Sequence, residues 1–368
     1  MAIDRRLFTS FDWTLLGLVL GVASLGLVNL YSASHAGGEA GAAYMKQAYW
    51  FGFGLAVMIM VALPDYRLLE TYAYPLYAVS LLLLLGVLVL GKSVSGGQRW
   101  IQLGGFAFQP SETAKVALVA VLSRFFLRGG RPGQAYSLRE LMVPAALLGG
   151  PFILVALEPD LGTALLMAAI FFSMVLFIGL HWKSLLAVVL SGLAALPVGW
   201  TMLKDYQRTR VMTFITPESD PLGAGYHAIQ SKIAVGSGML TGKGYLKGTQ
   251  AHLYFLPERH TDFIFSVWAE EWGFLGCTLV VCLYAALVVW GLNISRRSRE
   301  RFGRLLALGL TANIFWQAVV NIGMVLGVLP VVGVPLPLFS YGGSSLISTM
   351  ISIGLLMSVS MRRFMFQR

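Results

Sequence analysis

Residues 161–180 read LGTALLMAAIFFSMVLFIGL, twenty positions without an ionisable side chain. A helix rises about 1.5 Å per residue, so this stretch is about 30 Å long and matches the hydrocarbon thickness of a bilayer. Only 12% of the 368 residues are charged, roughly half the share that a soluble domain carries. The stretch therefore predicts a membrane span, and the composition excludes both a soluble monomer and a disordered chain.

Nine further apolar runs of helical length accompany this one. They cover residues 13–30, 49–63, 71–90, 113–128, 141–157, 184–203, 263–292, 305–329 and 344–361. Two of them, 49–63 and 113–128, are short for a span, and 263–292 is long enough to tilt or to project from the bilayer. We therefore predict an all-α, polytopic membrane protein with about ten transmembrane helices that forms a single domain over residues 1–368.

The basic residues predict the orientation of the chain. With the N-terminus inside, the short inner segments carry fifteen Lys and Arg, and the short outer loops carry three. Cytoplasmic loops collect such residues, so both termini are expected in the cytoplasm. The same rule accounts for the net charge of +10 without a nucleic-acid partner.

Four segments then fall on the outer face: 91–112, 158–160, 204–262 and 330–343. The long extracytoplasmic loop 204–262, between helices 7 and 8, is too polar to span, and we expect a short amphipathic helix near 226–235. The loop also contains the run GSGMLTGKG at 236–244. Its glycine spacing and the Gly after Lys243 do not fit a nucleotide-binding phosphate loop.

A looser interpretation of this loop is a basic, flexible face for an anionic group, formed by glycine amides and cationic side chains. The alternative is an ordinary solvated loop. The cations concerned are Arg208, Arg210, Lys232, Lys243 and Lys247.

Ionisable residues inside spans are costly and suggest function. Glu112 and Lys115 are neighbours on a helix because they are three residues apart; the alternative is a salt bridge that only neutralises both charges. Glu270 and Glu271 are adjacent and point about 100° apart on a helix. A hydrogen-bonded packing role is favoured for them.

Asp262 lies in ERHTDFIFS (258–266), where the outer loop becomes the eighth helix. A carboxylate between water and a partly dry cavity suits a general base that acts on a hydroxyl, and Arg259 and His260 lie close enough in sequence to tune it. The alternative is a carboxylate that complements the helix dipole, with Thr261 or Asp262 as the cap.

Other candidate sites are weaker. Arg99 and Trp100, in GGQRW (96–100), offer a polar contact at the outer interface, although an interfacial Trp is often only an anchor. Cys277 and Cys282 are five residues apart on different helix faces, so neither a disulfide nor a metal site is expected.

Four ordered motifs resemble the SEDS family (shape, elongation, division and sporulation). They are GGQRWI with QPSETAK (96–115), EPDLGTAL (158–165), LPERHTDFIFSVWAEEWG (256–273) and GVPLPLFSYGGSS (333–345). The resemblance covers nearly the whole chain, and it is greatest to the elongation member of the family. One departure is Met239, which stands where the family usually has Gly.

The resemblance implies the SEDS fold and a peptidoglycan glycosyltransferase that joins lipid II (undecaprenyl-diphosphate disaccharide pentapeptide) into glycan strands during elongation. It also implies a class B penicillin-binding protein and other elongation-complex membrane proteins as partners, in a bacterial cytoplasmic membrane with the active site outside. The essential aspartate of the family falls on Asp262. Its other conserved positions fall on Trp100, Glu112, Lys115 and Asp160.

The expected chemistry needs a base for the attacking hydroxyl and cations for the departing pyrophosphate. Asp262 is the expected base, and Lys115, Arg210 and Lys243 are the expected pyrophosphate ligands. A divalent cation such as Mg²⁺ or Mn²⁺ could share that role, but no ligand cluster in the sequence demands one. The expected substrate-binding residues are Arg99, Trp100, Glu112, Lys115, Asp160, Arg210, Lys243 and His260.

Two other functions stay open at this point. A lipid II flippase would use the same ligand, but it would need charges along a path through the bilayer, whereas most charges here cluster at the outer helix ends. A non-catalytic scaffold for the penicillin-binding protein would not need Asp262.

Overall fold

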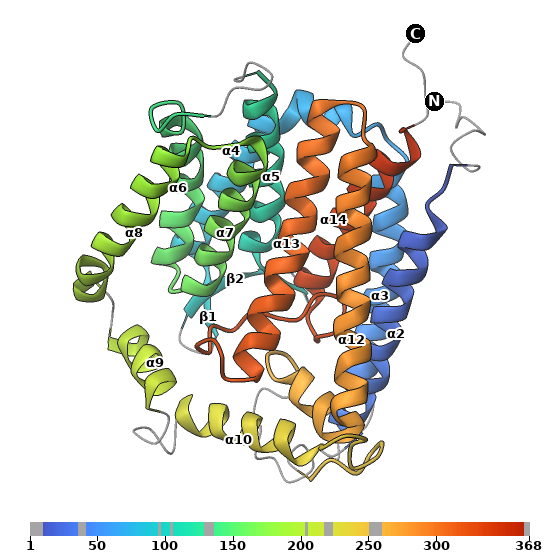
Figure 1. Ribbon diagram of the computed structural model, residues 1–368. Coiled ribbons are helices and arrows are strands. Elements are labelled where there is room, and N and C mark those ends of the chain that lie inside the picture. The colour runs from blue at the N-terminus through green and yellow to red at the C-terminus, as the bar shows by residue number, and fades with distance from the viewer. Residues whose placement is uncertain are drawn as a thin grey trace.

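A computed structural model describes residues 10–35, 42–94, 97–103, 106–128, 136–202, 205–216, 224–249 and 260–363. Most of them are helical (Figure 1). The helices are α2 (Trp13–His35), α3 (Ala42–Ala62), α4 (Arg67–Leu90), α5 (Pro110–Arg128), α6 (Met142–Leu157), α7 (Leu161–Ile178), α8 (Trp182–Met202), α9 (Asp205–Ile215), α10 (Ala224–Ser237), α12 (Ile264–Arg297), α13 (Arg301–Val325) and α14 (Gly343–Met361). The strands are β1 (Lys92–Val94), β2 (Gly97–Leu103) and β3 (Phe106–Phe108).

The apolar runs of the sequence all form helices of the bundle. Within the described ranges, eight helices are long and apolar enough to cross a membrane. Two more complete the expected ten: α5, whose sequence includes three charged residues besides its last Arg, and α6, which is 16 residues long. The run at 49–63 looked short because α3 begins earlier, at Ala42, and includes the polar Lys46 and Gln47. The chain is thus a multi-pass membrane protein.

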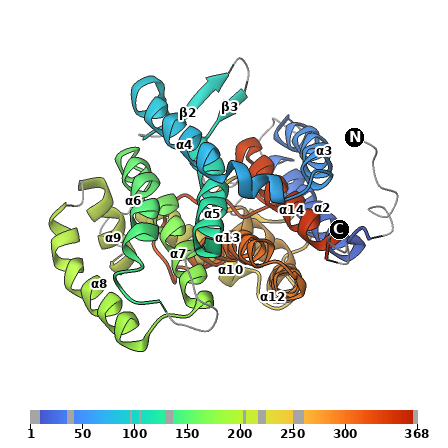
Figure 2. The ribbon, with the colours of Figure 1, turned by 90° about the horizontal axis from the view of Figure 1, so that it is seen from above.

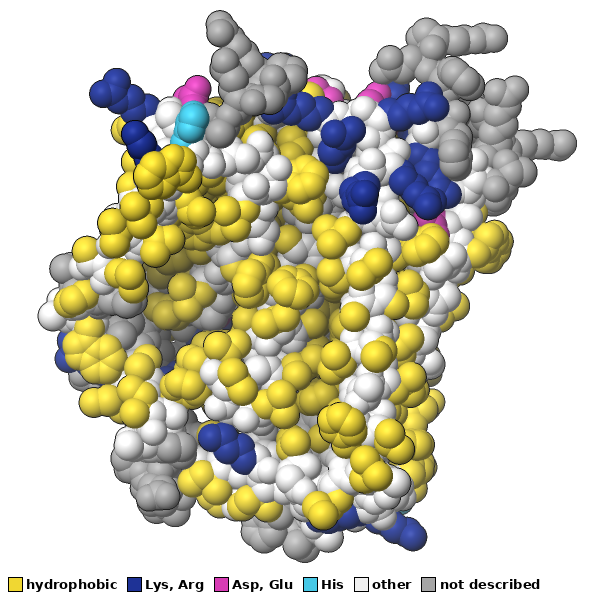
Figure 3. Space-filling model, in the orientation of Figure 1, with side chains coloured by type: hydrophobic (Ala, Val, Ile, Leu, Met, Phe, Trp, Pro, Cys, Tyr) yellow, Lys and Arg dark blue, Asp and Glu magenta, His cyan; other side chains and the backbone are white. Residues whose placement is uncertain are grey.

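The bundle is arranged around α5, α13 and α14, which are buried along most of their length. Seen from above, α8 lies at the periphery, away from these central helices (Figure 2). The outer surface is apolar over a broad band, and Lys and Arg side chains gather mainly at its upper end (Figure 3). A helical bundle that spans a bilayer needs such an apolar band between two polar ends.

The start of α2 and the end of α14 meet at one end of the bundle, where Ser360 Oγ donates to Asp12 Oδ2 at 2.5 Å. We call this the terminal end. The sheet, α9 and α10 lie at the opposite end, which we call the motif end (Figure 1). All four segments that the sequence analysis placed outside contribute to it.

Two elements of the motif end were not predicted. One is an antiparallel sheet in the order β1-β2-β3, which projects from the side of the bundle in Figure 2. The Gly pairs at 96–97 and 104–105 are a hairpin signal within a segment that we expected to be loop. The other is α9. The short helix expected near 226–235 is confirmed as α10.

The long helix α12 is broken at Gly273, whose φ of 61° and ψ of −159° are not helical. A break frees backbone groups, and inside a membrane these need protein partners. The glycine-rich segment 238–244 supplies them, and we call it the glycine clasp. Lys243 N donates to Glu270 O at 3.0 Å, and Phe274 N donates to Met239 O at 2.9 Å.

The glycines of the clasp allow this close approach. A Cβ on Gly242, which has φ +79°, would lie 2.0 Å from the Glu271 carbonyl oxygen, and one on Gly238 would lie 2.0 Å from that of Ala269. Lys243 and Gly244 donate their amides to α12. Gly242 N in turn donates to Gly238 O at 2.8 Å, so the idea that the glycine amides of this loop face an anion is wrong for Gly242 and Gly244.

Candidate functional site

Asp262 lies in the turn before α12, two residues ahead of the helix, with its side chain half-buried. Its backbone carbonyl accepts a 2.9 Å hydrogen bond from the Asn321 amide, which also donates to Val334 O at 2.8 Å. A Cβ on Gly333 would lie 3.5 Å from Asp262 Oδ2, so the carboxylate faces the Gly333 turn. One buried amide of α13 therefore fixes the aspartate against the segment that precedes α14.

Two further hydrogen bonds join these segments. Tyr341 N donates to His260 O at 2.9 Å, and Ser340 Oγ donates to Thr261 O at 2.7 Å. His260 thus lies in the same fixed turn as the candidate base, and its expected influence on Asp262 stays a prediction. Arg259 lies outside the described residues.

The helix cap differs from the alternative that the sequence left open. The cap position of α12 is Phe263, and it has no side-chain cap hydrogen bond. Asp262 and Thr261 both precede that position, so neither is the cap of α12. The cap assignment to Asp262 or Thr261 is therefore wrong, whereas the alternative that the carboxylate complements the helix dipole stays a prediction.

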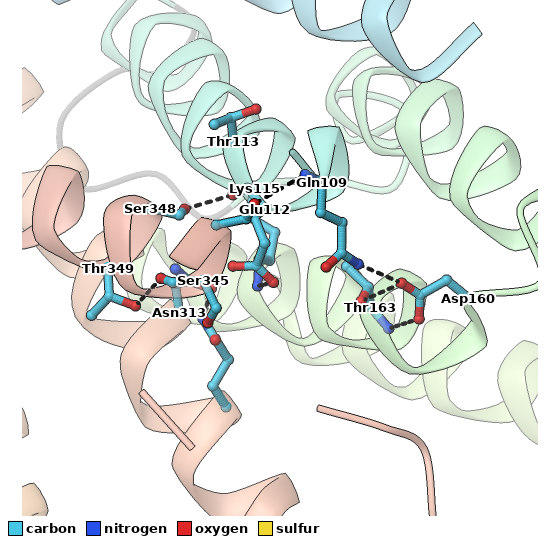
Figure 4. Close-up of polar contacts among 12 residues, drawn as sticks. Gln109, Glu112, Thr113, Lys115, Asp160, Thr163, Asn313, Ser345, Ser348 and Thr349 are labelled. Atoms are coloured by element: carbon cyan, nitrogen blue, oxygen red, sulfur yellow. Dashed lines mark hydrogen bonds and ion pairs between the residues drawn. The ribbon is translucent and has the colours of Figure 1, made fainter. Parts of the chain in front are cut away.

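Glu112 and Lys115 form a buried ion pair in the first two turns of α5. Lys115 Nζ and Glu112 Oε1 are 2.9 Å apart, and only 1% of the Lys115 side chain is exposed. Glu112 Oε2 has no hydrogen-bond partner within the described ranges. Ser348 of α14 donates to the Glu112 carbonyl at 2.8 Å, which anchors this part of α5 to the centre of the bundle (Figure 4). The spacing argument for a paired contact is confirmed.

Asp160 is the cap of α7 and the centre of a second polar group (Figure 4). Its carboxylate accepts hydrogen bonds from Thr163 N and Oγ1, at 3.3 and 2.9 Å, and from Gln109 Nε2 at 3.3 Å. Arg99 Nη1 lies 3.8 Å from Asp160 Oδ1. The arginine comes from β2, where the next residue, half-buried Trp100, pairs with Lys92 of β1. The sheet thus carries Arg99 to the start of α7.

Glu158 was missed as a site residue, although it stands in the EPDLGTAL motif. It is fully buried between α6 and α7, and neither carboxylate oxygen has a hydrogen-bond partner among the described residues. Burial raises its pKa to about 8, with a further rise from the nearby Asp160 charge that Arg99 partly offsets. Two carboxylates two residues apart in a tight turn were the available signal, because such a pair resists double ionisation.

The three cations expected to bind pyrophosphate lie in different surroundings. Lys243 Nζ lies 2.6 Å from Glu270 Oε1 and 2.9 Å from Thr249 Oγ1, and the same carboxylate oxygen accepts from Thr249 N. Lys243 is therefore already paired with a buried carboxylate. These bonds also confirm the packing role expected for Glu270.

Arg210 is separated from that network. It lies on α9 and lines a narrow cleft together with Lys232 of α10. Lys115 lies in a third place, inside the bundle. In the described part of the chain, no three side chains among His, Cys, Asp and Glu gather as a metal site would require.

The fold and these motifs match known proteins over nearly the whole chain. The family model described as cell cycle protein, which covers FtsW, RodA and SpoVE, matches residues 11–364. The peptidoglycan glycosyltransferase MrdB of Escherichia coli K12 is 45% identical over 358 residues, which are 97% of this chain and 95% of that protein. The peptidoglycan glycosyltransferase RodA of Treponema pallidum is 32% identical, over 96% and 98% of the two chains.

Solved structures show the same similarity. One chain, from work on the structural coordination of polymerization and crosslinking by a peptidoglycan synthase complex, has a TM-score of 0.83 and 36% identity, over 96% of this chain and 98% of that one. The rod shape determining protein RodA of Thermus thermophilus has a TM-score of 0.73 and 32% identity, over 97% and 98%. The chain therefore belongs to the FtsW/RodA/SpoVE family of membrane proteins, the SEDS family that its motifs indicate.

Proposed function

We propose that the protein is a peptidoglycan glycosyltransferase that polymerises lipid II during cell elongation, with Asp262 as its general base. The observation that carries this proposal is the placement of Asp262: a half-buried carboxylate at the motif end whose backbone is fixed by Asn321. Similarity to the glycosyltransferases MrdB and RodA supports the reaction class.

In the reaction, the 4-hydroxyl of one disaccharide attacks the anomeric carbon of a lipid-diphosphate-linked strand. A new C–O bond forms, the bond between the anomeric carbon and the phosphate oxygen breaks, and its electron pair leaves with the lipid diphosphate. Asp262 takes the hydroxyl proton as the bond forms. The fixed backbone keeps the carboxylate in one position, which lowers the entropic cost of reaching the reactive geometry.

The remaining candidates take supporting roles. Arg99 and Asp160 tie the sheet that carries Trp100 to α7, and this polar group at the motif end suits a sugar or peptide headgroup. His260 shares the fixed turn with the base. Lys115 is buried against Glu112, so it acts on the diphosphate only if the bundle opens, whereas Arg210 faces a surface cleft.

The proposed orientation puts the motif end outside the cell. The arginine-rich segments that follow α12 and α14 belong to the terminal end, and such segments stay in the cytoplasm. Both termini are then cytoplasmic, and the lipid tail of the substrate remains in the outer leaflet. The proposed partner is a class B penicillin-binding protein. The similar chain from a complex that couples polymerization to crosslinking supports that choice.

Reconstitution with labelled lipid II alone tests the function. Glycan polymer is the expected product. Transport of lipid II without polymer would identify a flippase, and the absence of both polymer and transport would identify a scaffold. Asp262→Asn should fold but polymerise at least about 10²-fold more slowly, the low end for general base catalysis. Glu140→Gln, the same change at an exposed carboxylate beside Ser137, is the matched control and should polymerise normally. Near-normal polymerisation by Asp262→Asn would remove Asp262 from the chemistry.

A further inference from the structure

A narrow cleft opens at the motif end between α9, α10 and the segment that follows α13. Its lining includes Arg210 and Thr213 of α9, Lys232 of α10 and Gly327 after α13. The side chains leave only about 10 Å³ of open space, room for one water molecule. Lys232 is exposed, so its ammonium group can turn toward an anion at the mouth of the cleft without a movement of the helices.

The polar groups of the cleft lack partners. The Thr213 hydroxyl belongs to a residue that is only 3% exposed, and it makes no hydrogen bond to any part of the chain that the structure describes. Among the described residues, neither Arg210 nor Lys232 has a carboxylate within 4.0 Å, whereas Lys243 does. Two cations without a counter-charge and a buried hydroxyl without a partner are the groups that bind a phosphate oxygen.

The lysine is placed by a glycine. A Cβ on Gly327, which has φ +69°, would lie 1.9 Å from Lys232 Cε, so the methylene chain of the lysine occupies space that only glycine leaves open. The adjacent Ser231 hydroxyl lies 2.8 Å from Ser266 Oγ and donates to Val325 O at 2.8 Å. These bonds fix α10, next to Lys232, against both α12 and α13.

The cleft is close to the candidate base. Asn321, which holds the backbone of Asp262, lies in the last two turns of α13, and Gly327 follows the end of that helix by two residues. Ser266, in the first turn of α12, contacts the residue before Lys232. A substrate whose reacting carbon lies near Asp262 can therefore reach the cleft with a group attached to that carbon.

We propose that Arg210, Thr213 and Lys232 form the site that holds the diphosphate of the lipid-linked donor. This inference rests on the proposed function. As the bond between the anomeric carbon and the phosphate oxygen breaks, the electron pair and a negative charge pass to that oxygen, and the two cations stabilise the departing lipid diphosphate. Lys243, by contrast, stabilises the glycine clasp.

Direct binding tests the site without turnover. The full-length protein in detergent is titrated calorimetrically with farnesyl diphosphate, which carries the diphosphate on a short isoprenoid, and separately with inorganic pyrophosphate. Lys232→Met keeps the apolar stem over Gly327 and should weaken farnesyl diphosphate binding at least about ten-fold. Thr213→Val, an isosteric change, should weaken it roughly three-fold or more. Lys46→Met, at an exposed lysine near the start of α3, should bind like the wild type.

The outcomes separate this site from the function. Asp262→Asn should bind farnesyl diphosphate normally even though its polymerisation is lost. Selective weakening in the Lys232 and Thr213 variants supports the site even if the protein makes no polymer. Wild-type affinity in both variants overturns the proposed site even if the protein makes polymer. Comparable weakening for pyrophosphate identifies the ligand as the diphosphate alone, and weakening confined to farnesyl diphosphate identifies it as a lipid headgroup.

Discussion

Glu158→Gln tests the buried carboxyl group between α6 and α7. Glutamine has nearly the same shape but cannot ionise. Burial raises the pKa of Glu158 from 4.5 to about 8, so the folded protein keeps a proton that the unfolded chain releases. Unfolding therefore releases a proton between these two values, and stability falls as the pH rises through that window. It is independent of this group below about pH 4.5 and again above about pH 8.

The size of the effect follows from the shift. Each pH unit in the window costs about 1.4 kcal/mol, so the carboxyl group lowers stability by about 3 kcal/mol at pH 7 and by nearly 5 at pH 8 and above. Glu158→Gln removes this cost. We expect a melting temperature several degrees above that of the wild type at pH 8.5, and a much smaller difference at pH 5.

Tryptophan fluorescence during heating, in detergent at several pH values, measures this difference. Glu140→Gln is the control because hydrogen bonds from Ser137 lower the pKa of the exposed Glu140. The stability that Glu140 contributes is lost only as the pH falls through that low pKa, so Glu140→Gln should change the melting temperature by the same amount at every pH between 5 and 8.5. A gain from Glu158→Gln that does not grow with pH would refute the assignment of a protonated Glu158.

Three other changes test the rest of the site. Gly242→Ala should destabilise the protein by at least about 2 kcal/mol, from a backbone clash and a left-handed φ. Gly244→Ala should cost only about 1 kcal/mol. Melting curves that do not separate these two variants would contradict the role of the glycine clasp. Glu112→Gln should lower stability by about 3 kcal/mol because it leaves a buried ammonium unpaired, and adding Lys115→Met should recover that stability. If the double variant also polymerises lipid II, Lys115 is excluded from the chemistry. Lys243→Met should lower the melting temperature but leave farnesyl diphosphate affinity unchanged in calorimetry, and a weakened affinity would return this lysine to the substrate site.

The spans could be predicted from the sequence because hydropathy reports contact with lipid, which a helix experiences over its whole length. The helix at 161–178 ends within two residues of the apolar run that predicted it. Pair contacts within one helix were equally accessible, as Glu112 and Lys115 demonstrate, since helical spacing alone makes them neighbours.

Contacts between distant segments could not be predicted in the same way. Lys243 and Thr249 meet Glu270 across more than twenty residues, and nothing in the local pattern distinguishes a lysine with a buried carboxylate partner from one that faces solvent. The same is true of Asn321, which appeared as one polar residue in an apolar run but holds the backbone of Asp262.

The break in α12 links the clasp to the candidate base. In a continuous helix from Ile264 to Arg297, the first two turns would be coaxial with the rest. The break at Gly273 lets these turns point in a different direction from the rest of α12. Those turns carry Ser266, which contacts α10, and they begin two residues after Asp262. The clasp satisfies the backbone groups that the break frees. We therefore expect Lys243 to affect the position of the candidate base through the fold of α12, while its own ammonium group is bound to Glu270.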